Sequence, residues 1–328
     1  MSLEKIFVVT LHHMIKQGVV YCSTGSQYKV KSEERFYTCG IKGKFRIKGI
    51  KSTNPVAVGD RVSFALEKEG EDIGVINGIE PRANYIVRKS VNLSKQIHII
   101  ASNIDQAFLM ITLKTPPTHP AFIDRFLVTA KAYQIEVILV FNKIDIYTEE
   151  ELNSLHEMRK VYENIGYKCV EVVAKNKSSL KEIQGLMQGK VSMFSGHSGV
   201  GKSTLVNTLS PGLSLKTAAV SLQHQQGQHT TTFAEMYDME NDAKIIDTPG
   251  IKGFGVVDID KEELANYFPE FFELKSGCKF NNCLHINEPK CAVKDALEDG
   301  KIAWSRYKSY LQILEGEEEH YRKDIYEK

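Results

Sequence analysis

Residues 196–203 constrain the fold of this chain more than any other segment, because they match the phosphate-binding loop pattern Gly-x-x-x-x-Gly-Lys-Ser. Glycines let the backbone curl so that its N–H groups converge on phosphate oxygens, and the following helix adds its positive end. An apolar run at 191–194 precedes the loop, and Leu205, Val206 and Leu209 give the next segment an apolar helix face. This order predicts an α/β nucleotide-binding domain; the alternative is an incidental glycine-rich turn.

The whole loop is expected to contact a nucleotide. Lys202 would neutralise the β and γ phosphates, and the Ser203 hydroxyl would ligate magnesium. The predicted contact residues are Gly196, His197, Ser198, Gly199, Val200, Gly201, Lys202, Ser203 and Thr204.

A second motif, Asp-Thr-Pro-Gly, begins at Asp247 after the apolar segment 244–246. An aspartate that ends a buried strand beside a phosphate loop can hold magnesium through water, and the N–H of Gly250 can reach a γ phosphate. Alone, the tetrapeptide is a plausible turn. Together with the phosphate loop it indicates a nucleoside triphosphate site.

A third motif, formed by Asn142, Lys143, Ile144 and Asp145, follows the apolar run 135–141. A carboxylate only accepts hydrogen bonds, so Asp145 suits the adjacent N–H groups at N1 and N2 of guanine and would be repelled by the acceptor N1 of adenine. A helix cap or a polar turn is the alternative. In combination, the three motifs predict that the chain binds GTP and GDP.

From residue 97 onward, apolar runs alternate with helical periodicity. Strands are expected at 98–101, 106–112, 135–141, 169–173 and 191–194, and helices at 122–130, at 148–165 and from residue 179. Buried strands between amphipathic helices predict a parallel sheet covered on both faces. Such sheets bind ligands at the carboxyl ends of their strands.

The first eighty residues lack long helical periodicity. Short strands are expected at 18–21, 28–31, 36–39, 44–47, 61–66 and 74–79, which together suit a small OB-like β-barrel, with 82–94 as a connection. A cationic strand face on this barrel could contact RNA phosphates, although an ordinary solvated face is an equal alternative. That face would carry Lys42, Lys44, Arg46 and Lys48.

Near the C-terminus, cysteine and histidine cluster. Three thiolates and one imidazole form a closed tetrahedral set that suits a structural zinc ion and leaves no open position for catalysis. Residues 292–321, which follow, are rich in helix formers, so a small metal-bound helical unit is expected; buried free cysteines are the alternative. The predicted ligands are Cys278, Cys283, His285 and Cys291.

Composition supports a multidomain globular protein. The chain has 328 residues, of which 42% are hydrophobic and 25% charged, and its net charge of +1 gives no general attraction to nucleic acid or membrane. No segment approaches the roughly 18 apolar residues of a membrane helix. We therefore expect a cytoplasmic protein without membrane contact.

The order of the motifs is unusual, because the base-reading motif precedes the phosphate loop instead of coming last. Together with a barrel and a Cys/His cluster, this order resembles the circularly permuted ribosome small-subunit-dependent GTPases that assist late subunit maturation. The resemblance implies an OB-like, RNA-binding β-barrel over 1–86, a permuted α/β P-loop GTPase domain over 87–260 and a zinc-binding helical domain over 261–328.

The same resemblance implies the function. We expect slow GTP hydrolysis that the small ribosomal subunit stimulates, with that subunit and its rRNA as partners of a monomer. The implied cofactors are GTP or GDP, Mg²⁺ and one structural Zn²⁺. Two alternatives remain: a P-loop kinase or ATPase, and an RNA assembly module with negligible turnover.

The resemblance also places single residues. The N–H of Ala174 lies in the second base-contacting element, and Thr231 matches a switch threonine that would reach magnesium and the γ phosphate. Ile251 stands where many GTPases have a water-orienting glutamine, so His229 is our hypothesis for that role, with an exposed loop histidine as the alternative. The expected catalytic residues are therefore Lys202, His229 and Thr231, and the expected magnesium ligands are Ser203, Thr231 and Asp247.

Overall fold

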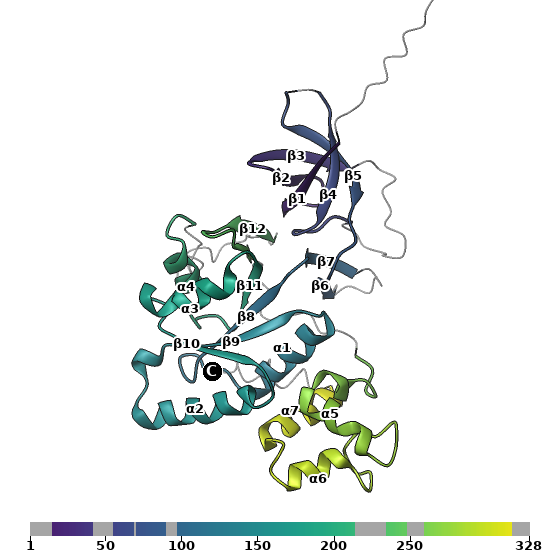
Figure 1. Ribbon diagram of the computed structural model, residues 1–328, viewed down its shortest axis with the longest axis vertical. Coiled ribbons are helices and arrows are strands. Elements are labelled where there is room, and N and C mark those ends of the chain that lie inside the picture. The colour runs from purple at the N-terminus through teal and green to yellow at the C-terminus, as the bar shows by residue number, and fades with distance from the viewer. Residues whose placement is uncertain are drawn as a thin grey trace, which may run out of the picture.

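The structure is a computed structural model that describes residues 15–41, 55–68, 70–89, 97–213, 234–247 and 259–316. Figure 1 shows a β-barrel at one end, a sheet flanked by helices in the middle and a small helical unit at the other end. Among the described residues, no helix combines the length and apolar character needed to span a membrane.

Five strands close the N-terminal barrel. They follow the order β1-β2-β3-β5-β4, and β1 also pairs with β4. Alternate residues point inward, as in β2, so Val20, Val30, Phe64 and Ile76 form a buried core. The predicted OB-like barrel is confirmed, while the expected strand 44–47 and the four cations Lys42 to Lys48 lie outside the described residues. The strands are β1 (Ile15–Ser23), β2 (Tyr28–Ser32), β3 (Arg35–Ile41), β4 (Arg61–Leu66) and β5 (Ile73–Ile79).

An antiparallel ribbon follows the barrel. It consists of β6 (Tyr85–Lys89) and β7 (Ile97–Ser102). The interpretation of 82–94 as a plain connection is therefore wrong at β6, and the predicted strand 98–101 joins this ribbon instead of the parallel sheet. The signal in β6 was weak because only a short apolar stretch lies between polar neighbours, although Ile86 packs in the core beside Ala101.

The strands of the central domain follow the order β10-β9-β8-β11-β13-β12, in which all neighbours are parallel except β12, which runs antiparallel to β13 and also pairs with β1 of the barrel. Successive residues of β8 point to opposite faces: Leu109 packs with Phe126 and Leu155, whereas Phe108 packs with residues of the other face. Two-sided cover is therefore confirmed, but the short antiparallel strand β12 was not predicted. The strands are β8 (Gln106–Ile111), β9 (Glu136–Asn142), β10 (Lys168–Val172), β11 (Val191–Ser195), β12 (Glu235–Asp238) and β13 (Lys244–Asp247).

Helices cover this sheet on both faces (Figure 1). Residues of the first two helices pack in one apolar cluster, and residues of the next two pack in the other. The helices are α1 (Pro120–Ala132), α2 (Glu149–Glu163), α3 (Lys181–Met187) and α4 (Lys202–Leu209), with short 3₁₀ helices η1 (Ile144–Ile146) and η2 (Lys177–Leu180).

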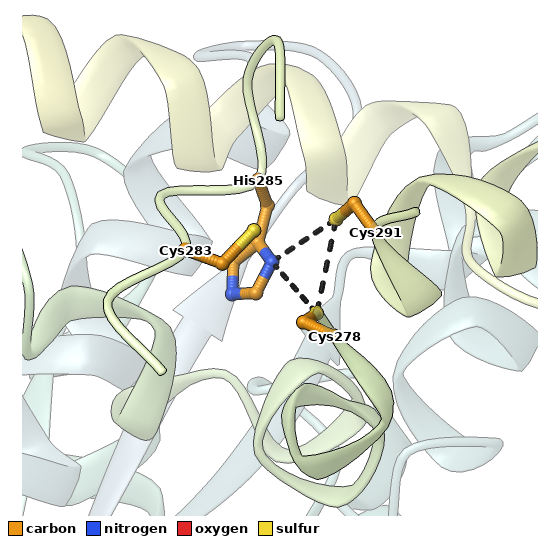
Figure 2. Close-up of side chains that lie close together, drawn as sticks. All are labelled: Cys278, Cys283, His285 and Cys291. Carbon is orange, nitrogen blue, oxygen red and sulfur yellow. Dashed lines mark hydrogen bonds between the residues drawn. The ribbon is translucent and has the colours of Figure 1, made fainter. Parts of the chain in front are cut away.

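The C-terminal unit has its own apolar core, which includes Phe268, Phe271 and Tyr310. The four-residue Cys/His cluster lies within this unit (Figure 2). The helical character predicted for 292–321 is confirmed up to residue 315, and residues 317–321 lie outside the described part. The elements are η4 (Leu264–Tyr267), α5 (Pro269–Leu274), η5 (Lys275–Gly277), α6 (Ala292–Glu298) and α7 (Trp304–Glu315).

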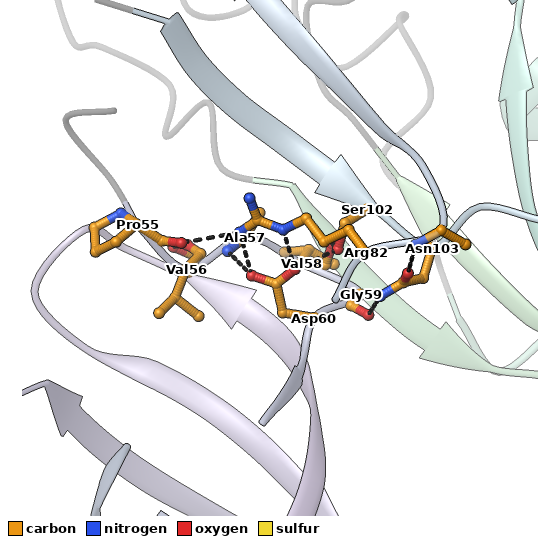
Figure 3. A network of polar contacts seen from close by, with 11 residues as sticks. Pro55, Val56, Ala57, Val58, Gly59, Asp60, Arg82, Ser102 and Asn103 are labelled. Carbon is orange, nitrogen blue, oxygen red and sulfur yellow. Dashed lines mark hydrogen bonds and ion pairs between the residues drawn. The ribbon is translucent and has the colours of Figure 1, made fainter. Parts of the chain in front are cut away.

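A buried polar network joins the barrel to the rest of the chain (Figure 3). Arg82 forms an ion pair with Asp60, with 2.6 Å from Nε to Oδ1, and Ser102 donates to the same Oδ1 at 2.6 Å. The neighbouring Gly59 has φ +91°, and a Cβ there would lie 2.1 Å from the carbonyl oxygen of Ser102. Because no other residue fits this approach, the joint is closely packed.

Candidate nucleotide site and metal centre

The three predicted motifs meet at one edge of the central sheet. The base-reading motif begins at Asn142 at the end of β9, the phosphate loop follows β11, and Asp247 ends β13. Strands β9, β8, β11 and β13 are neighbours and run parallel, so their carboxyl ends share this edge. The sequence prediction of a site at the carboxyl edge therefore agrees with the strand order.

Two glycines of the phosphate loop permit contacts that a side chain would block. Gly196 has φ +137°, and a Cβ there would lie 2.7 Å from the carbonyl oxygen of Met110. Gly201 has φ +106°, and its Cβ would lie 2.4 Å from Nδ2 of Asn142. The loop can thus pass close to both β8 and the base-reading motif only with glycine at these positions.

Lys202 begins α4 and turns back over the loop. Its Nζ donates to the carbonyl oxygens of Gly196 and His197, both at 2.7 Å. Burial lowers the pKa of Lys202 to about 8, and the nearby carboxylate of Asp247 acts in the opposite direction. A partly desolvated ammonium group held by backbone oxygens is well suited to receive phosphate oxygens.

Asn142 connects the base-reading motif with two other segments. Its Nδ2 donates to the carbonyl oxygen of Val200 at 2.7 Å, and its Oδ1 accepts from the N–H of Ala174 at 2.9 Å. Ala174 thus lies beside the base-reading motif, as the resemblance implied. Its N–H already has a partner here, so a contact with a base would require sharing or exchange of that bond.

Lys143 links the phosphate loop to the segment that follows β8. Its Nζ donates to the carbonyl oxygens of Thr115 at 2.5 Å and Gly199 at 2.9 Å. Burial and, next, the charge of Lys175 lower the pKa of Lys143. The contribution of Thr115 was not found from the sequence, because a backbone carbonyl in a connecting loop leaves no residue signature.

The remaining predicted residues divide into two groups. Ile144 and Asp145 lie in η1, with Asp145 exposed, and Ser203 and Thr204 lie half-buried in the first turn of α4. His229, Thr231 and Gly250 lie outside the described residues, so their roles stay predictions.

The Cys/His cluster has the composition and spacing of a metal centre. The ligand atoms of Cys278, Cys283, His285 and Cys291 all lie within 4.8 Å of one another. Nδ1 of His285 points toward the thiols, 3.3 Å from Sγ of Cys291 and 3.6 Å from Sγ of Cys278 (Figure 2). Three sulfurs and one nitrogen at these separations could surround one metal ion.

Hydrogen bonds to the backbone hold the ligand loop in place. The Tyr307 hydroxyl donates to the carbonyl oxygen of His285 at 2.7 Å. The carboxylate of Glu288 accepts from the N–H groups of Leu284 and Ile286 at 2.7 and 2.8 Å. His285 itself has φ +59°. The loop is therefore ordered by contacts that do not involve the four ligand atoms.

Comparison with known protein families identifies the family to which this chain belongs. Residues 79–257 match the RsgA GTPase family, and residues 17–76 match the RsgA N-terminal domain. The chain belongs to the RsgA GTPase family. A Christiangramia forsetii protein named small ribosomal subunit biogenesis GTPase RsgA is 64% identical over 95% of this chain and 100% of its own. A protein of the same name from Flavobacterium johnsoniae is 63% identical over 94% of this chain and 96% of its own.

Solved structures of the family agree with the fold. YjeQ from Thermotoga maritima has 34% identity and a TM-score of 0.75, and the match covers 92% of this chain and 98% of YjeQ. YloQ, described as a circularly permuted GTPase, has 30% identity and a TM-score of 0.72 over 97% and 99% of the two chains. The predicted family and its permuted motif order are confirmed, and as an RsgA GTPase the chain is a GTP-hydrolysing enzyme.

Proposed function

We propose that this chain hydrolyses GTP during late maturation of the small ribosomal subunit, and that the subunit stimulates its turnover. The observation that carries this proposal is the pair of hydrogen bonds by which Asn142 joins the base-reading motif to the phosphate loop and to Ala174. They bring the guanine-selective and phosphate-binding parts together despite their permuted order. The names of the RsgA relatives supply the ribosomal context.

The described residues have distinct roles in this reaction. Backbone N–H groups of residues 196–203 and the ammonium of Lys202 would bind the phosphates, while Asp145 would select guanine. Ser203 and Asp247 offer the hard oxygen ligands that magnesium prefers, and Asp247 ends β13, which pairs with the strand β11 that precedes the loop. Magnesium would neutralise the charge that develops on the transferred phosphate.

Three predicted residues outside the described part complete the proposed machinery. Thr231 would add a magnesium ligand, Gly250 would donate its N–H to the γ phosphate, and His229 would orient the attacking water. His229→Ala tests the last role by single-turnover hydrolysis at saturating GTP, with GTP affinity measured separately. An unchanged rate would remove the histidine from the mechanism.

The C-terminal cluster is proposed to hold one structural zinc ion. Four protein ligands close a tetrahedral site and leave no position for a reacting water.

The proposed partner is the small ribosomal subunit with its rRNA. The chain would act as a monomer in the cytoplasm, and its domain boundaries would lie near residues 86 and 260. Lys42, Lys44, Arg46 and Lys48 would supply phosphate contacts from the barrel.

A nucleotide-dependent sedimentation assay with purified small and large ribosomal subunits tests this function. We expect the chain to sediment with the small subunit in the GTP state, and its GTPase rate in the same mixture to rise. Tighter binding of ATP than of GTP would favour a kinase or ATPase. Negligible turnover with subunits present would favour an assembly module that uses nucleotide only for its structure.

A further inference from the structure

His197 occupies a position of the phosphate loop where the sequence pattern requires no particular residue. Its imidazole lies against the ring of Phe122, with 3.9 Å between ring centroids and 33° between ring planes. Phe122 belongs to the first turn of α1. A residue that the pattern leaves open is therefore held by an aromatic contact from outside the loop.

The backbone of His197 helps to determine where Lys202 rests. The Lys202 ammonium is shared between the carbonyl oxygens of Gly196 and His197. A shift of the His197 peptide would move one of these two acceptors. The ring of Phe122 can thus act on the position of Lys202 through His197.

The chain before α1 contacts the loop at a second point. Lys143 links the carbonyl oxygens of Thr115 and Gly199, and a Cβ on Gly199 would lie 3.4 Å from Cδ of Pro116. The connection from β8 to α1 and the first turn of α1 therefore support the phosphate loop on the two sides of Ser198. A loop supported at two points is preorganised for its ligand.

We propose that Phe122 is a positioning residue for nucleotide binding, because its ring fixes His197 and thereby the phosphate loop and Lys202. This role rests on the proposed function, since it requires a nucleotide in the loop. An aromatic pair contributes about 1 kcal/mol, which corresponds to about a fivefold change in affinity. The affinities for GDP and GTP should fall by the same factor, since both nucleotides carry the β phosphate.

Phe122→Leu and Phe126→Leu form a matched pair of variants. Phe126 lies on the same helix, but it is 3% exposed and packs in the apolar core. We expect Phe122→Leu to raise the Kd for GDP and GTP about fivefold. Phe126→Leu should lower Tm and leave both Kd values unchanged, and Phe122→Tyr should restore wild-type affinity. Kd values within twofold of wild type in Phe122→Leu would overturn the proposal.

A double-mutant cycle distinguishes the ring contact from general damage to α1. If Phe122 acts through His197, the double variant Phe122→Leu/His197→Ala should bind GDP no more weakly than His197→Ala alone. Fully additive losses would contradict this mechanism. If the wild-type chain binds neither nucleotide, both proposals fail; if it binds both and Phe122→Leu matches it, only the positioning role fails.

Discussion

Arg306 on α7 donates from Nη1 to Oδ1 of Asp124 on α1 at 2.6 Å, and both side chains are buried. The same guanidinium reaches Glu270 on α5, with 2.7 Å from Nε to Oε1. Tyr162 on α2 donates to Asp124 at 2.9 Å. This network joins the C-terminal unit, which carries the Cys/His cluster, to the central domain at α1, the helix that also carries Phe122.

Replacement of Arg306 should destabilise this junction. Arg306→Met removes the shared cation and leaves two buried carboxylates without their partner, so the free energy of unfolding should fall by about 3 kcal/mol or more. Urea denaturation of the full chain measures this change. Lys308→Met, which alters an exposed residue of the same helix, is the control and should change stability by less than about 0.5 kcal/mol. Equal stability of the two variants would show that the network contributes little.

Loss of one cluster ligand should release the metal and loosen the C-terminal unit. Cys278→Ser should reduce bound zinc from about one ion per chain to near zero and lower Tm, because metal binding and folding of such units are coupled. Elemental analysis and calorimetry provide the two measurements. Cys22→Ser changes a cysteine of β1 that lies outside the cluster, and it should retain the metal. A purified wild-type chain without stoichiometric zinc would contradict the assignment.

Local sequence patterns predicted where the three motifs lie better than they predicted the strands and side-chain contacts around them. The phosphate loop, Asn142 and Asp247 each follow a strongly apolar strand, so short-range spacing was sufficient to place them at one sheet edge. Strands β6 and β12 were missed because they are short and carry polar residues. The contact between Asp124 and Arg306 spans 182 positions in the chain, and it depends on how distant helices pack. The Phe122–His197 contact likewise follows from packing and leaves no pattern in the sequence.

Nucleotide affinity should decrease above about pH 8 because of Lys202. Burial lowers the pKa of the lysine to about 8, whereas bound phosphates would stabilise the ammonium and raise that pKa. Above about pH 8 the free chain has largely lost the Lys202 proton and must take it up again when the nucleotide binds. The Kd for GDP should therefore be roughly sixfold higher at pH 8.8 than at pH 7. Fluorescence titrations across this range measure the effect. Lys202→Arg stays charged and should show a flat profile, and a flat profile in the wild type would contradict the explanation.

Asp145→Asn should change the preferred base. The Asp145 carboxylate lies exposed in η1, where it can accept from two guanine N–H groups; an asparagine offers one acceptor and one donor, which matches the 2-oxo group of xanthine instead. GTP affinity should fall by about 100-fold, because hydrogen bonds to charged groups contribute about 1.5–3 kcal/mol, and XTP affinity should rise. Competition binding with both nucleotides measures the exchange. Asp242→Asn, at an exposed turn between β12 and β13, should keep the preference for guanine. If Asp145→Asn still favours GTP over XTP, Asp145 does not read the base.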